Sequence, residues 1–397
     1  MVKFLHTADW HLGIKYKHLG DKAQEARDIR LKTVKKVLEL AKDNYVDFVL
    51  VAGDIFDSNQ VDRSLITELS KIFSQIAPTS VYLLPGNHDP LTMDSLYHDP
   101  VWQTLDNLTI FSEPEPLMHG NVILYPCPVN QKQSREDPTQ WIEAKSNNIS
   151  IGVAHGNLQV GKIENNFPID PQRTEKSGLD YLALGEWHSL FKQKDSKGIT
   201  RTVYSGTPET TKFGEDTSGK TVIVKIDSPN AIPQITEIEV GNLSWEKHEI
   251  EINSLIDVNN MELNLKNVPQ PQKNIISLKI RGVTDPKTIS YLSSLEDRYH
   301  NHFMFFQLLM SELYLKPNLL ELKALLPEGT VINQTFEALM ALMKTQPEIQ
   351  DYSDISSERT SEIFAQLRDK DIIEGLSPKV LNYAFILMYQ MIKEASQ

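Results

Sequence analysis

Cysteine is almost absent from this chain of 397 residues, in which Cys127 is the single example. One cysteine excludes an internal disulfide framework and a cysteine-rich zinc motif. Long apolar runs are missing too, because none approaches the roughly 20 residues that a helix needs to cross a bilayer. The first strand-like segment begins almost at Met1 and leaves no room for a signal peptide. These absences predict a cytoplasmic protein with no membrane partner.

Positive charge is scarce as well, since the formal net charge is -13. This balance argues against a broadly basic surface that coats nucleic acid. It does not exclude an enzyme that acts on phosphates, because bound divalent ions bring positive charge to the place where a phosphate sits. The chain has no internal repeat and no Gly-rich phosphate loop with Lys, so any ATPase activity must belong to another chain. Its length is sufficient for two or three domains.

Polar side chains follow five short apolar segments that are typical of buried strands. The segments are residues 2–5, 48–52, 81–84, 151–154 and 181–184. The polar residues that follow them are Asp9, His11, Asp54, Asn87, His155, Glu186 and His188. In open α/β sheets, ligands collect beyond the carboxyl ends of the strands. A mixed set of carboxylate, amide and imidazole ligands favours Mn²⁺ or Fe²⁺ over Ca²⁺. The sequence therefore predicts a two-metal site.

The spacing within these segments suggests how the ions are shared. Asp9 and His11 stand at i and i+2, so on an extended segment both side chains point to the same side and can chelate one ion. A carboxylate can bridge two ions, and ions roughly 3.5–4 Å apart activate a water and polarise a phosphate for in-line attack. Each piece alone is common in proteins. Their occurrence together, with the tetrapeptide at residues 86–89, makes chance a poor explanation.

The order of these motifs resembles that of the calcineurin-like metallophosphoesterases. Residues 8–13, 53–57 and 204–209 more narrowly resemble the SbcD-type nuclease subunit of a DNA double-strand-break repair complex. The resemblance covers roughly the first three-fifths of the chain. It implies an α/β fold, a two-sheet sandwich flanked by helices, followed by a small α+β cap domain and a C-terminal helical segment.

The resemblance also implies the ligands of two divalent ions, for which Mn²⁺ is the expected metal. Asp9, His11 and His188 would hold one ion, Asn87 and His155 the other, and Asp54 would bridge them. One residue departs from the family, which has Gly-His-x-His where this chain has Gly185-Glu186-Trp187-His188. Glu186 is either an oxygen ligand that makes the second site harder and less positive, or it points away and leaves that ion loosely held.

Two further roles follow from the resemblance. His88 would be the catalytic imidazole, and Asp57 would accept a hydrogen bond from it and fix its tautomer. The alternative for Asp57 is a loop cap. Substrate is expected to contact Lys15, Lys17 and His18, just after the first metal loop, and the segment Tyr204, Ser205, Gly206 and Thr207. For the basic group, a merely solvated surface is the alternative.

Three regions are expected along the chain. Residues 1–240 would form the nuclease domain, with alternating strands and helices at first and mostly strands later. Residues 241–316 show a strand, helix, strand pattern in which Asp285 caps a helix that begins at Pro286, and by resemblance they form the capping domain that helps to orient DNA. Residues 317–397 are expected to be helical, with a polar break at residues 346–357 and a partner-docking role implied by the family.

The last predicted helix, residues 378–395, is apolar on almost all sides. One stripe consists of Val380, Tyr383, Ala384, Leu387, Met388 and Met391, and further apolar positions are Leu381, Phe385, Ile386 and Ile392. The pattern fits a helix that packs into a local core. It also fits a helix with a face left over for a groove on a partner.

The function predicted from these observations is a two-metal DNA phosphodiesterase, an exonuclease with endonuclease activity as a second mode, acting in DNA repair or DNA-end processing. Its expected partners are DNA, an SbcC-type coiled-coil ATPase of the SMC-like kind, and a second copy of the chain. Two alternatives remain. The first is a calcineurin-like phosphoesterase that acts on small nucleotides or phosphoesters, and the second is a non-catalytic scaffold whose metal site is weakened by Glu186.

Overall fold

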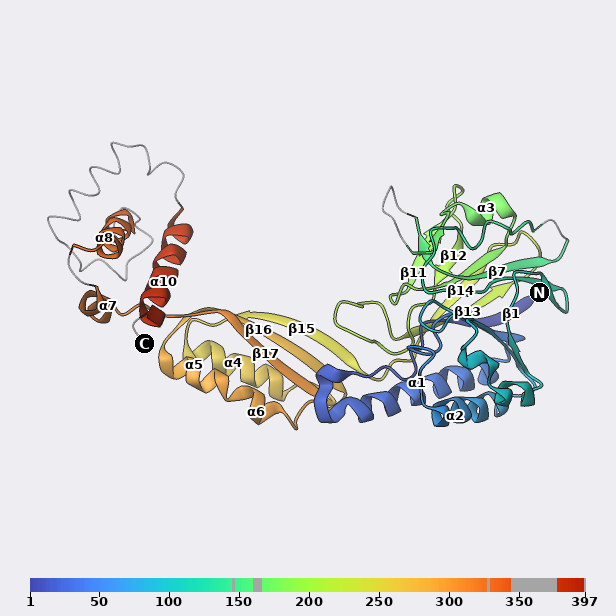
Figure 1. The fold of residues 1–397 in the computed structure, drawn as a ribbon, viewed down its shortest axis with the longest axis horizontal. Helices are drawn as coiled ribbons and strands as arrows, with labels where there is room; N and C mark the ends of the chain where they lie inside the picture. Colours follow the sequence, from blue (N-terminus) through green and yellow to red (C-terminus); the bar gives the residue numbers. More distant parts are fainter. Residues whose placement is uncertain (145–146, 160–165, 327–328, 344–376, 396–397) are drawn as a thin grey trace. The chain divides into compact units, whose positions relative to one another are not determined.

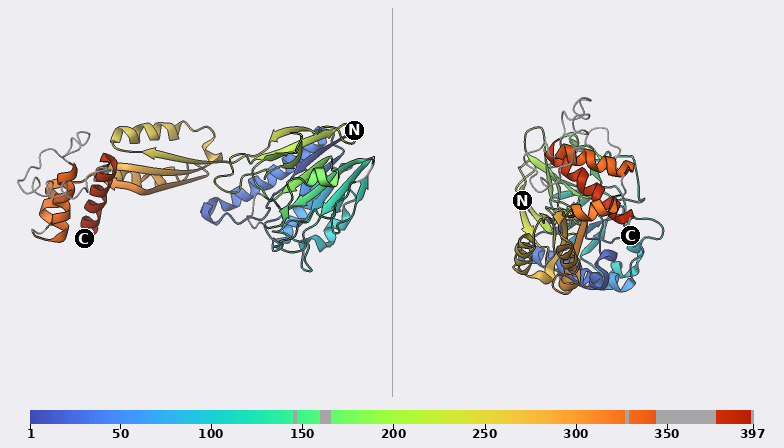
Figure 2. Two further views of the ribbon diagram at one scale, coloured as in Figure 1. Left: turned by 90° about the horizontal axis from the view of Figure 1, so that it is seen from above. Right: turned by 90° about the vertical axis from the view of Figure 1, so that its left-hand side faces the viewer.

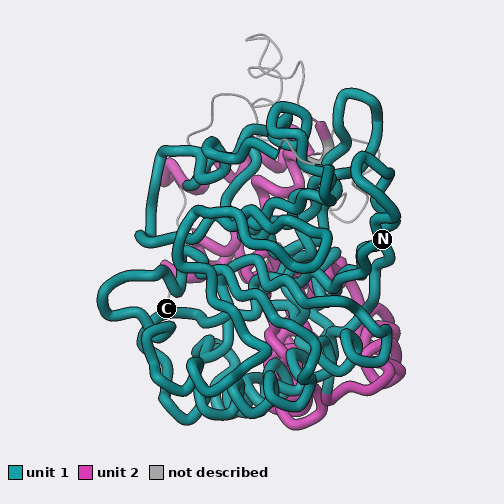
Figure 3. The backbone as a smooth tube through the Cα atoms, turned by 90° about the vertical axis from the view of Figure 1, so that its right-hand side faces the viewer, with its two compact units in different colours: residues 1–246, 273–275 teal, residues 247–272, 276–397 magenta. Residues whose placement is uncertain are grey.

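The computed structural model describes residues 1–144, 147–159, 166–326, 329–343 and 377–395. The chain divides into two compact units, one of residues 1–246 with 273–275 and the other of residues 247–272 and 276–397 (Figure 3). Each unit encloses its own cluster of buried apolar side chains. The boundaries and roles expected for a nuclease, a capping and a docking region stay predictions.

The first sheet of the larger unit is built on four parallel strands, β1 (Val2–Thr7), β2 (Phe48–Ala52), β3 (Ser80–Leu84) and β4 (Leu108–Ile110). β13 (Lys220–Ile226) runs antiparallel beside β1, and β14 (Gln234–Glu239) follows it at the edge. Every residue of β2 is buried. Burial on both faces explains why this strand reads as a continuous apolar run rather than an alternating one.

Two long helices cover the outer face of this sheet. They are α1 (Ala23–Asp43), which follows the 3₁₀ turn η1 (Lys17–Lys22), and α2 (Arg63–Ser74) (Figure 1). Asp62 begins α2 by accepting a hydrogen bond from the Ser64 amide at 2.8 Å, which satisfies a free N–H at the helix start. The apolar stripe of α1, including Val34, Val37 and Leu38, packs against the sheet. Short 3₁₀ turns η2 (Leu96–His98) and η3 (Pro100–Thr104) precede β4.

The second sheet also has a parallel centre, made of β6 (Val122–Cys127), β7 (Ile149–His155), β10 (Tyr181–Gly185) and β12 (Thr200–Tyr204). Its edges are the antiparallel strands β5 (Leu117–His119) and β11 (Phe191–Lys194). A small pair, β8 (Asn157–Leu158) with β9 (Pro168–Ile169), and the short helix α3 (Arg173–Ser177) lie in the connection from β7 to β10.

The core of the larger unit lies between the two sheets. Phe4 and Phe48 stack with ring centroids 5.2 Å apart, and Tyr181 of the second sheet meets Phe4 edge-on at 5.4 Å. The predicted α/β fold, a two-sheet sandwich flanked by helices, is confirmed. The five apolar segments that precede the polar motifs are β1, β2, β3, β7 and β10, as the sequence predicted.

The smaller unit holds a three-stranded sheet in the order β15-β16-β17, with bounds Ser244–Glu251, Asn274–Thr284 and Phe305–Leu315. Helices α4 (Leu255–Lys266), α5 (Pro286–Ser293) and α6 (Leu295–Tyr299) cover one face of it, and η4 (Pro271–Lys273) precedes β16 (Figure 1). Asp285 caps α5 as predicted, since its side chain accepts from the amides of Lys287 and Thr288. The sequence pattern had not indicated β15 and α4.

Three C-terminal helices form a further cluster in this unit, α7 (Leu319–Leu325), α8 (Val331–Met343) and α10 (Pro378–Ala395). α10 packs against α8 (Figure 2) and has the predicted bounds. Its buried face consists of Leu381, Phe385, Ile386 and Tyr389, whereas Val380, Tyr383 and Met391 of the stripe described above are exposed. The sequence did not decide which side packs inward because both sides are apolar. The predicted polar break at residues 346–357 lies outside the described residues.

No helix among the described residues is long and apolar enough to cross a membrane.

Candidate metal centre

The side chains predicted to bind metal converge at one edge of the sandwich. Each lies just beyond the carboxyl end of β1, β2, β3, β7 or β10. The pairing of β7 with β10 places Gly185 opposite His155, so the residues that follow these two strands are neighbours. Potential ligand atoms lie within 4.8 Å of one another in three groups, namely Asp9 with His11 and His188, His11 with Asp57 and His88, and Asp9 with Asp54 and His155.

Asp54 stands at the centre of this cluster. Its Oδ2 lies 3.7 Å from His11 Nε2 on one side and 3.4 Å from His155 Nε2 on the other. Its Oδ1 accepts a hydrogen bond from the His88 amide at 2.9 Å, which fixes the carboxylate plane. Burial alone would raise the pKa of Asp54, but the neighbouring His155 holds it well below its usual range. An ionised carboxylate with one oxygen between two imidazole nitrogens has the geometry of a bridging ligand.

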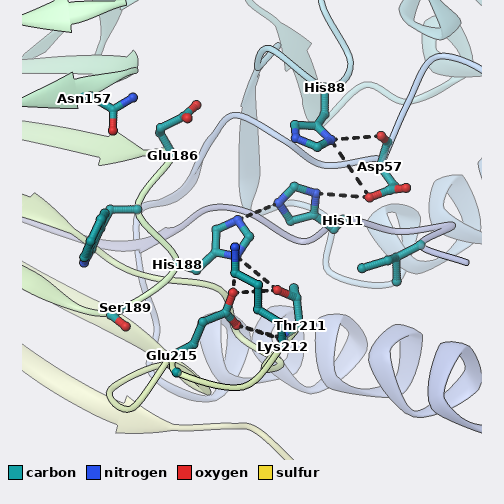
Figure 4. Close-up of a pocket in the computed structure, with 13 residues that line it drawn as sticks. His11, Asp57, His88, Asn157, Glu186, His188, Ser189, Thr211, Lys212 and Glu215 are labelled. Atoms are coloured by element: carbon teal, nitrogen blue, oxygen red, sulfur yellow. Dashed lines mark hydrogen bonds and ion pairs between the residues drawn. The ribbon is translucent and has the colours of Figure 1, made fainter. Parts of the chain in front are cut away.

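The nitrogens of His11 and His188 face each other on one side of Asp54. The two Nε2 atoms are 2.9 Å apart, and His188 Nδ1 lies 2.6 Å from Glu215 Oε1 (Figure 4). Because the carboxylate can only accept, Nδ1 of His188 carries a proton, which leaves Nε2 as the nitrogen that would bind a metal. Burial lowers the pKa of His11 to about 4, so this imidazole is neutral near pH 7. Nε2 of His11 and Nε2 of His188 therefore point to the same position, where both could bind one metal ion.

Asp9 completes this side of the site. Its Oδ1 accepts from the Glu186 amide at 3.0 Å, whereas Oδ2 is buried and has no hydrogen-bond partner. Burial raises the pKa of Asp9 to about 7, because an isolated carboxylate is poorly stabilised there. A buried oxygen without a partner, beside two imidazole nitrogens, is a donor set that a divalent ion would satisfy. The residues present thus fit a metal.

Oxygen atoms surround His155 on the other side of Asp54. His155 Nδ1 donates to the Ala52 carbonyl at 3.0 Å, which turns Nε2 toward Asn87 Oδ1 at 3.3 Å and Glu186 Oε2 at 3.0 Å. Burial lowers the pKa of His155, but the carboxylates of Asp54 and Glu186 raise it well above the usual range. His155 thus holds a proton among these oxygen atoms, and a metal cation bound to the same atoms would replace that proton.

Glu186 points into this cluster rather than away from it. Besides the approach to His155, its Oε2 is buried and has no hydrogen bond of acceptable geometry. Its backbone has φ 103°, a conformation that side-chain-bearing residues seldom adopt. Such a conformation persists only where the surroundings enforce it, and here the Glu186 amide is bound to Asp9.

The backbone of the first metal loop differs from the prediction. Asp9 and His11 were expected on an extended segment, but β1 ends at Thr7 and both residues have positive φ, 55° and 42°. Hydrogen bonds between loops cause the change, since the amide of Asp9 donates to Gly53 at 3.0 Å and that of His11 to Asp54 at 2.9 Å. The side chains of Asp9 and His11 still lie close enough to hold one ion together, because a strained loop brings them there.

His88 lies at the open side of the cluster, with about half of its side chain (48%) exposed. Its Nδ1 is 3.1 Å from the backbone carbonyl of Asp57 and 4.0 Å from the nearer carboxylate oxygen. Asp57 thus contacts His88 mainly through its main-chain oxygen and not through its carboxylate. Because a carbonyl can only accept, it still fixes the proton on Nδ1. The Asp57 carboxylate lies instead 3.6 Å from His11 Nδ1 (Figure 4).

Three supporting residues were not identified from the sequence. Asp89 accepts from the amides of Gly86 and Phe56, both at 2.8 Å, and so joins the loops after β3 and β2. It is the last residue of the Gly-Asn-His-Asp motif, so a signal existed. Glu215 orients His188, and hydrogen bonds from His188 and Thr211 overcome the effect of burial and lower its pKa to about 2. It follows no strand, and no local pattern marks it.

Arg30 is the third supporting residue. It lies on α1 with 1% of its surface exposed and donates to the carbonyls of Trp10 at 2.7 Å and Glu209 at 2.6 Å. It also donates to the Tyr16 hydroxyl at 2.6 Å. These bonds hold the first metal loop against the segment that follows β12. On a sequence basis Arg30 looks like one more charge on an exposed helix face.

The site opens into a cavity of about 460 Å³ that is lined by His11, His88, Glu186, Trp187, His188 and Lys212, among others. The predicted substrate contacts Lys15, Lys17 and His18 do not line it. All three are exposed, and Lys15 borders a separate cavity of about 410 Å³ between α1 and the start of α2. The left-handed turn at Tyr16, with φ 45°, leads the chain away from the metal loop.

The segment from Tyr204 to Thr207 also lies outside the cavity. Tyr204, Ser205, Gly206 and Thr207 are all buried. The Tyr204 hydroxyl donates to the Gly156 carbonyl at 2.7 Å, and the Thr207 amide donates to the His188 carbonyl at 2.9 Å. The segment was expected beside the substrate. In the structure it lies beneath the site and supports the loop that carries His188.

Among the known proteins that resemble this chain in sequence or structure are the following four. "Uncharacterized metallophosphoesterase YhaO" of Bacillus subtilis is 25% identical over 271 residues, which is 63% of either protein. Proteins named "DNA double-strand break repair protein Mre11" are 23% identical in Saccharolobus solfataricus, over 53% of this chain and 55% of the relative, and 23% identical in Sulfurisphaera tokodaii, over 72% and 76%. The crystal structure of calcineurin-like phosphoesterase YfkN from Bacillus subtilis superposes with a TM-score of 0.39 at 13% identity, over 67% of this chain and 97% of that one.

The matched part of this chain thus spans about three-fifths of the first relative and about half of the second. Members of the calcineurin-like family use divalent metals, and the Asp and His side chains gathered here can bind one. The family model described as calcineurin-like phosphoesterase matches residues 2–218, more than half of the chain. The chain therefore belongs to the calcineurin-like metallophosphoesterases.

Proposed function

We propose that this phosphoesterase is a two-metal DNA nuclease that hydrolyses phosphodiesters from DNA ends and also within strands. The observation that carries the proposal is the position of Asp54. One of its oxygens stands between His11 Nε2 and His155 Nε2, at 3.7 and 3.4 Å. A single carboxylate oxygen between two separate sets of donors is what a pair of ions sharing one ligand requires.

The chain's own residues divide into two sets. Asp9, His11 and His188 would hold one ion, and Asn87, His155 and Glu186 would hold the other. When bound, such ions lower the pKa of a water and polarise a phosphate. Mn²⁺ suits both sets because it accepts nitrogen as well as carboxylate ligands.

His88 would act on the leaving group. Its Nδ1 proton is held by the Asp57 carbonyl at 3.1 Å, and its exposed ring borders the cavity. In the imidazolium form, Nε2 can donate a proton to the leaving oxygen of a cleaved phosphodiester. The role is that of a general acid, which needs the ring to be positioned but not buried.

DNA as the substrate is supported by the relatives, not by the metal site. Two proteins that match this chain at 23% identity are named for DNA double-strand break repair. The same metal arrangement on a smaller substrate would give a phosphoesterase for nucleotides or simple esters. A scaffold with an impaired site is the third outcome. The relative of highest identity among those described above carries a name with no substrate, so it does not separate these alternatives.

The test is a side-by-side assay of plasmid DNA, a single-stranded oligonucleotide and a chromogenic phosphate bis-ester, each with Mn²⁺. We expect cleavage of both DNA substrates, abolished by EDTA. Asp54→Ala should lose activity on all substrates, since removal of the bridging carboxylate disturbs both ions. Asp43→Ala, at the exposed end of α1, is the matched control and should behave as wild type. Cleavage of the bis-ester alone would favour the small-substrate enzyme, and inactivity on all three would favour the scaffold.

We further propose that α10 docks on an SbcC-type ATPase subunit with an SMC-like coiled coil. Val380, Tyr383 and Met391 are 55%, 49% and 69% exposed on one side of α10, opposite its buried face. Apolar side chains in this arrangement suit a groove on a partner helix pair. Val380→Glu with Met391→Glu should abolish co-purification with such a subunit while nuclease activity persists. Glu394→Gln on the same helix is the control. Undiminished co-purification of the double variant would refute the docking role.

A further inference from the structure

Trp187 is the one tryptophan among the described residues that is exposed, with 54% of its surface accessible. It lines the cavity at the metal centre. The backbone on either side is fixed, because the Glu186 amide donates to Asp9 and the His188 side chain is bound to Glu215 at 2.6 Å. A large apolar ring is therefore held in water beside the reaction centre. Single apolar side chains at a protein surface are common, so it is the place of this ring in the wall of the cavity that makes it available to a ligand.

Lys212 lines the same cavity from the loop between β12 and β13. Its backbone belongs to the turn organised by Glu215, and its side chain extends toward His188 (Figure 4). The cavity thus combines the indole ring of Trp187, the ammonium group of Lys212 and the candidate metal ligands. The indole ring can pack on a base, the ammonium group can bind a neighbouring phosphate, and the metal ligands lie where the scissile phosphate would bind.

We infer that Trp187 stacks on an unpaired base next to the cleaved phosphodiester and that Lys212 binds an adjacent phosphate, so that the site takes single-stranded DNA or a frayed DNA end. This inference rests on the proposed nuclease function and specifies its substrate. Every base has a face that an aromatic ring can cover, so such stacking is tolerant of sequence. In a duplex both faces of a base are already stacked, and the base must be extruded before Trp187 can reach it.

The acidic side chains of the site are consistent with separate roles for Trp187 in stacking and for Lys212 in phosphate binding. Glu186 and Asp57 line the same cavity as Trp187, so the protein alone attracts a polyanion weakly there. Stacking supplies binding free energy that does not depend on charge, and Lys212 offsets part of the repulsion. A simple phosphoester without a base needs neither residue.

The test measures binding and cleavage separately. Affinity for a fluorescent 15-residue thymidine oligonucleotide is measured by anisotropy in EDTA and in Ca²⁺, and kcat and KM are measured with Mn²⁺. Trp187→Ala should weaken binding by roughly 5- to 150-fold, the range found for loss of one base–aromatic stack. The change should appear in KM more than in kcat. Trp187→Phe retains a ring and should recover most of the affinity. Lys212→Ala should reduce the salt dependence of binding.

Two controls distinguish stacking from a structural effect. Tyr45 and Lys42 are exposed just before β2, at the end of this strand opposite to the candidate metal centre. Tyr45→Ala and Lys42→Ala should therefore bind the oligonucleotide as wild type does. An oligonucleotide of abasic residues should bind wild type and Trp187→Ala equally. Equal binding of the thymidine strand to both proteins would overturn the inference while leaving the nuclease function intact. A wild-type protein that neither binds nor cleaves any DNA would overturn the proposed function as well.

Discussion

Replacing Glu215 by Gln should weaken Mn²⁺ binding although Glu215 is not itself a ligand. Its Oε1 lies 2.6 Å from His188 Nδ1, and its Oε2 accepts from the Thr211 amide at 2.7 Å. Glutamine has the same shape but one acceptor. If its oxygen faces His188, its NH₂ group meets the Thr211 N–H. If the glutamine oxygen faces Thr211 instead, the NH₂ group meets His188 Nδ1 and forces the His188 proton onto Nε2, the atom that would bind metal.

The structure allows the size of this effect to be worked out. Exchange of a charge-assisted hydrogen bond for a neutral one costs about 1–1.5 kcal/mol. That difference corresponds to roughly tenfold in affinity. Where the amide turns the other way and the wrong tautomer of His188 is stabilised, the loss should approach 100-fold, the upper range for groups that orient a metal-binding histidine.

Isothermal titration of the metal-free protein with Mn²⁺ measures this loss directly. Glu215→Asp keeps the charge and should recover part of the affinity, and Glu39→Gln on the exposed face of α1 is the matched control. Thermal denaturation in EDTA would establish that each variant is folded at the temperature of the titration. A folded Glu215→Gln protein with wild-type affinity would refute the account of His188 as a ligand oriented by Glu215.

Three further changes test other parts of the site and fold. His88→Leu should lower turnover by about 100-fold or more while metal is retained, and Asp57→Asn should lower it less because the Asp57 carbonyl remains; normal turnover in His88→Leu, or loss of metal, would contradict the assignment. Metal analysis of Glu186→Ala should find about one ion where wild type holds two, with altered metal preference in Glu186→His, and two tightly held ions in Glu186→Ala would show that Glu186 is not a ligand. Burial lowers the pKa of His6 to about 3, whereas the unfolded chain titrates near 6.5, so unfolding takes up a proton between these values and the fold loses about 1.4 kcal/mol per pH unit on acidification. Urea denaturation at pH 7, 6 and 5 should show that the free energy of unfolding falls more steeply on acidification in wild type than in His6→Gln; identical slopes in the two proteins would contradict it.

The sandwich was predictable because its strands carry a strong local signal. β2 and β10 are buried on both faces, so their sequences are uninterrupted apolar runs that end at a Gly followed by a polar residue. The candidate metal ligands follow such strands directly, and parallel strands bring their carboxyl ends to one edge. Because these residues each follow a strand in the sequence, the sequence alone indicated that they lie close together in the fold.

The parts that could not be predicted depend on contacts between distant segments. Glu215 and Arg30 act through hydrogen bonds to His188 and to the Trp10 carbonyl, and neither residue has a distinctive local pattern. The buried face of α10 could not be chosen from the sequence because apolar residues occupy both sides and only tertiary packing decides which is buried. The contact of His88 with the main-chain oxygen of Asp57 could not be foreseen, because a sequence gives the side chain of Asp57 but not the direction of its carbonyl group.

The central claim is that Asp54 bridges two ions, and anomalous scattering from crystals grown with Mn²⁺ tests it most directly. The account predicts two peaks roughly 3.5–4 Å apart on either side of the Asp54 carboxylate. One should lie within bonding distance of Asp9, His11 and His188, and the other within bonding distance of Asn87 and His155. A single peak, or a pair in which Asp54 touches neither ion, would contradict it.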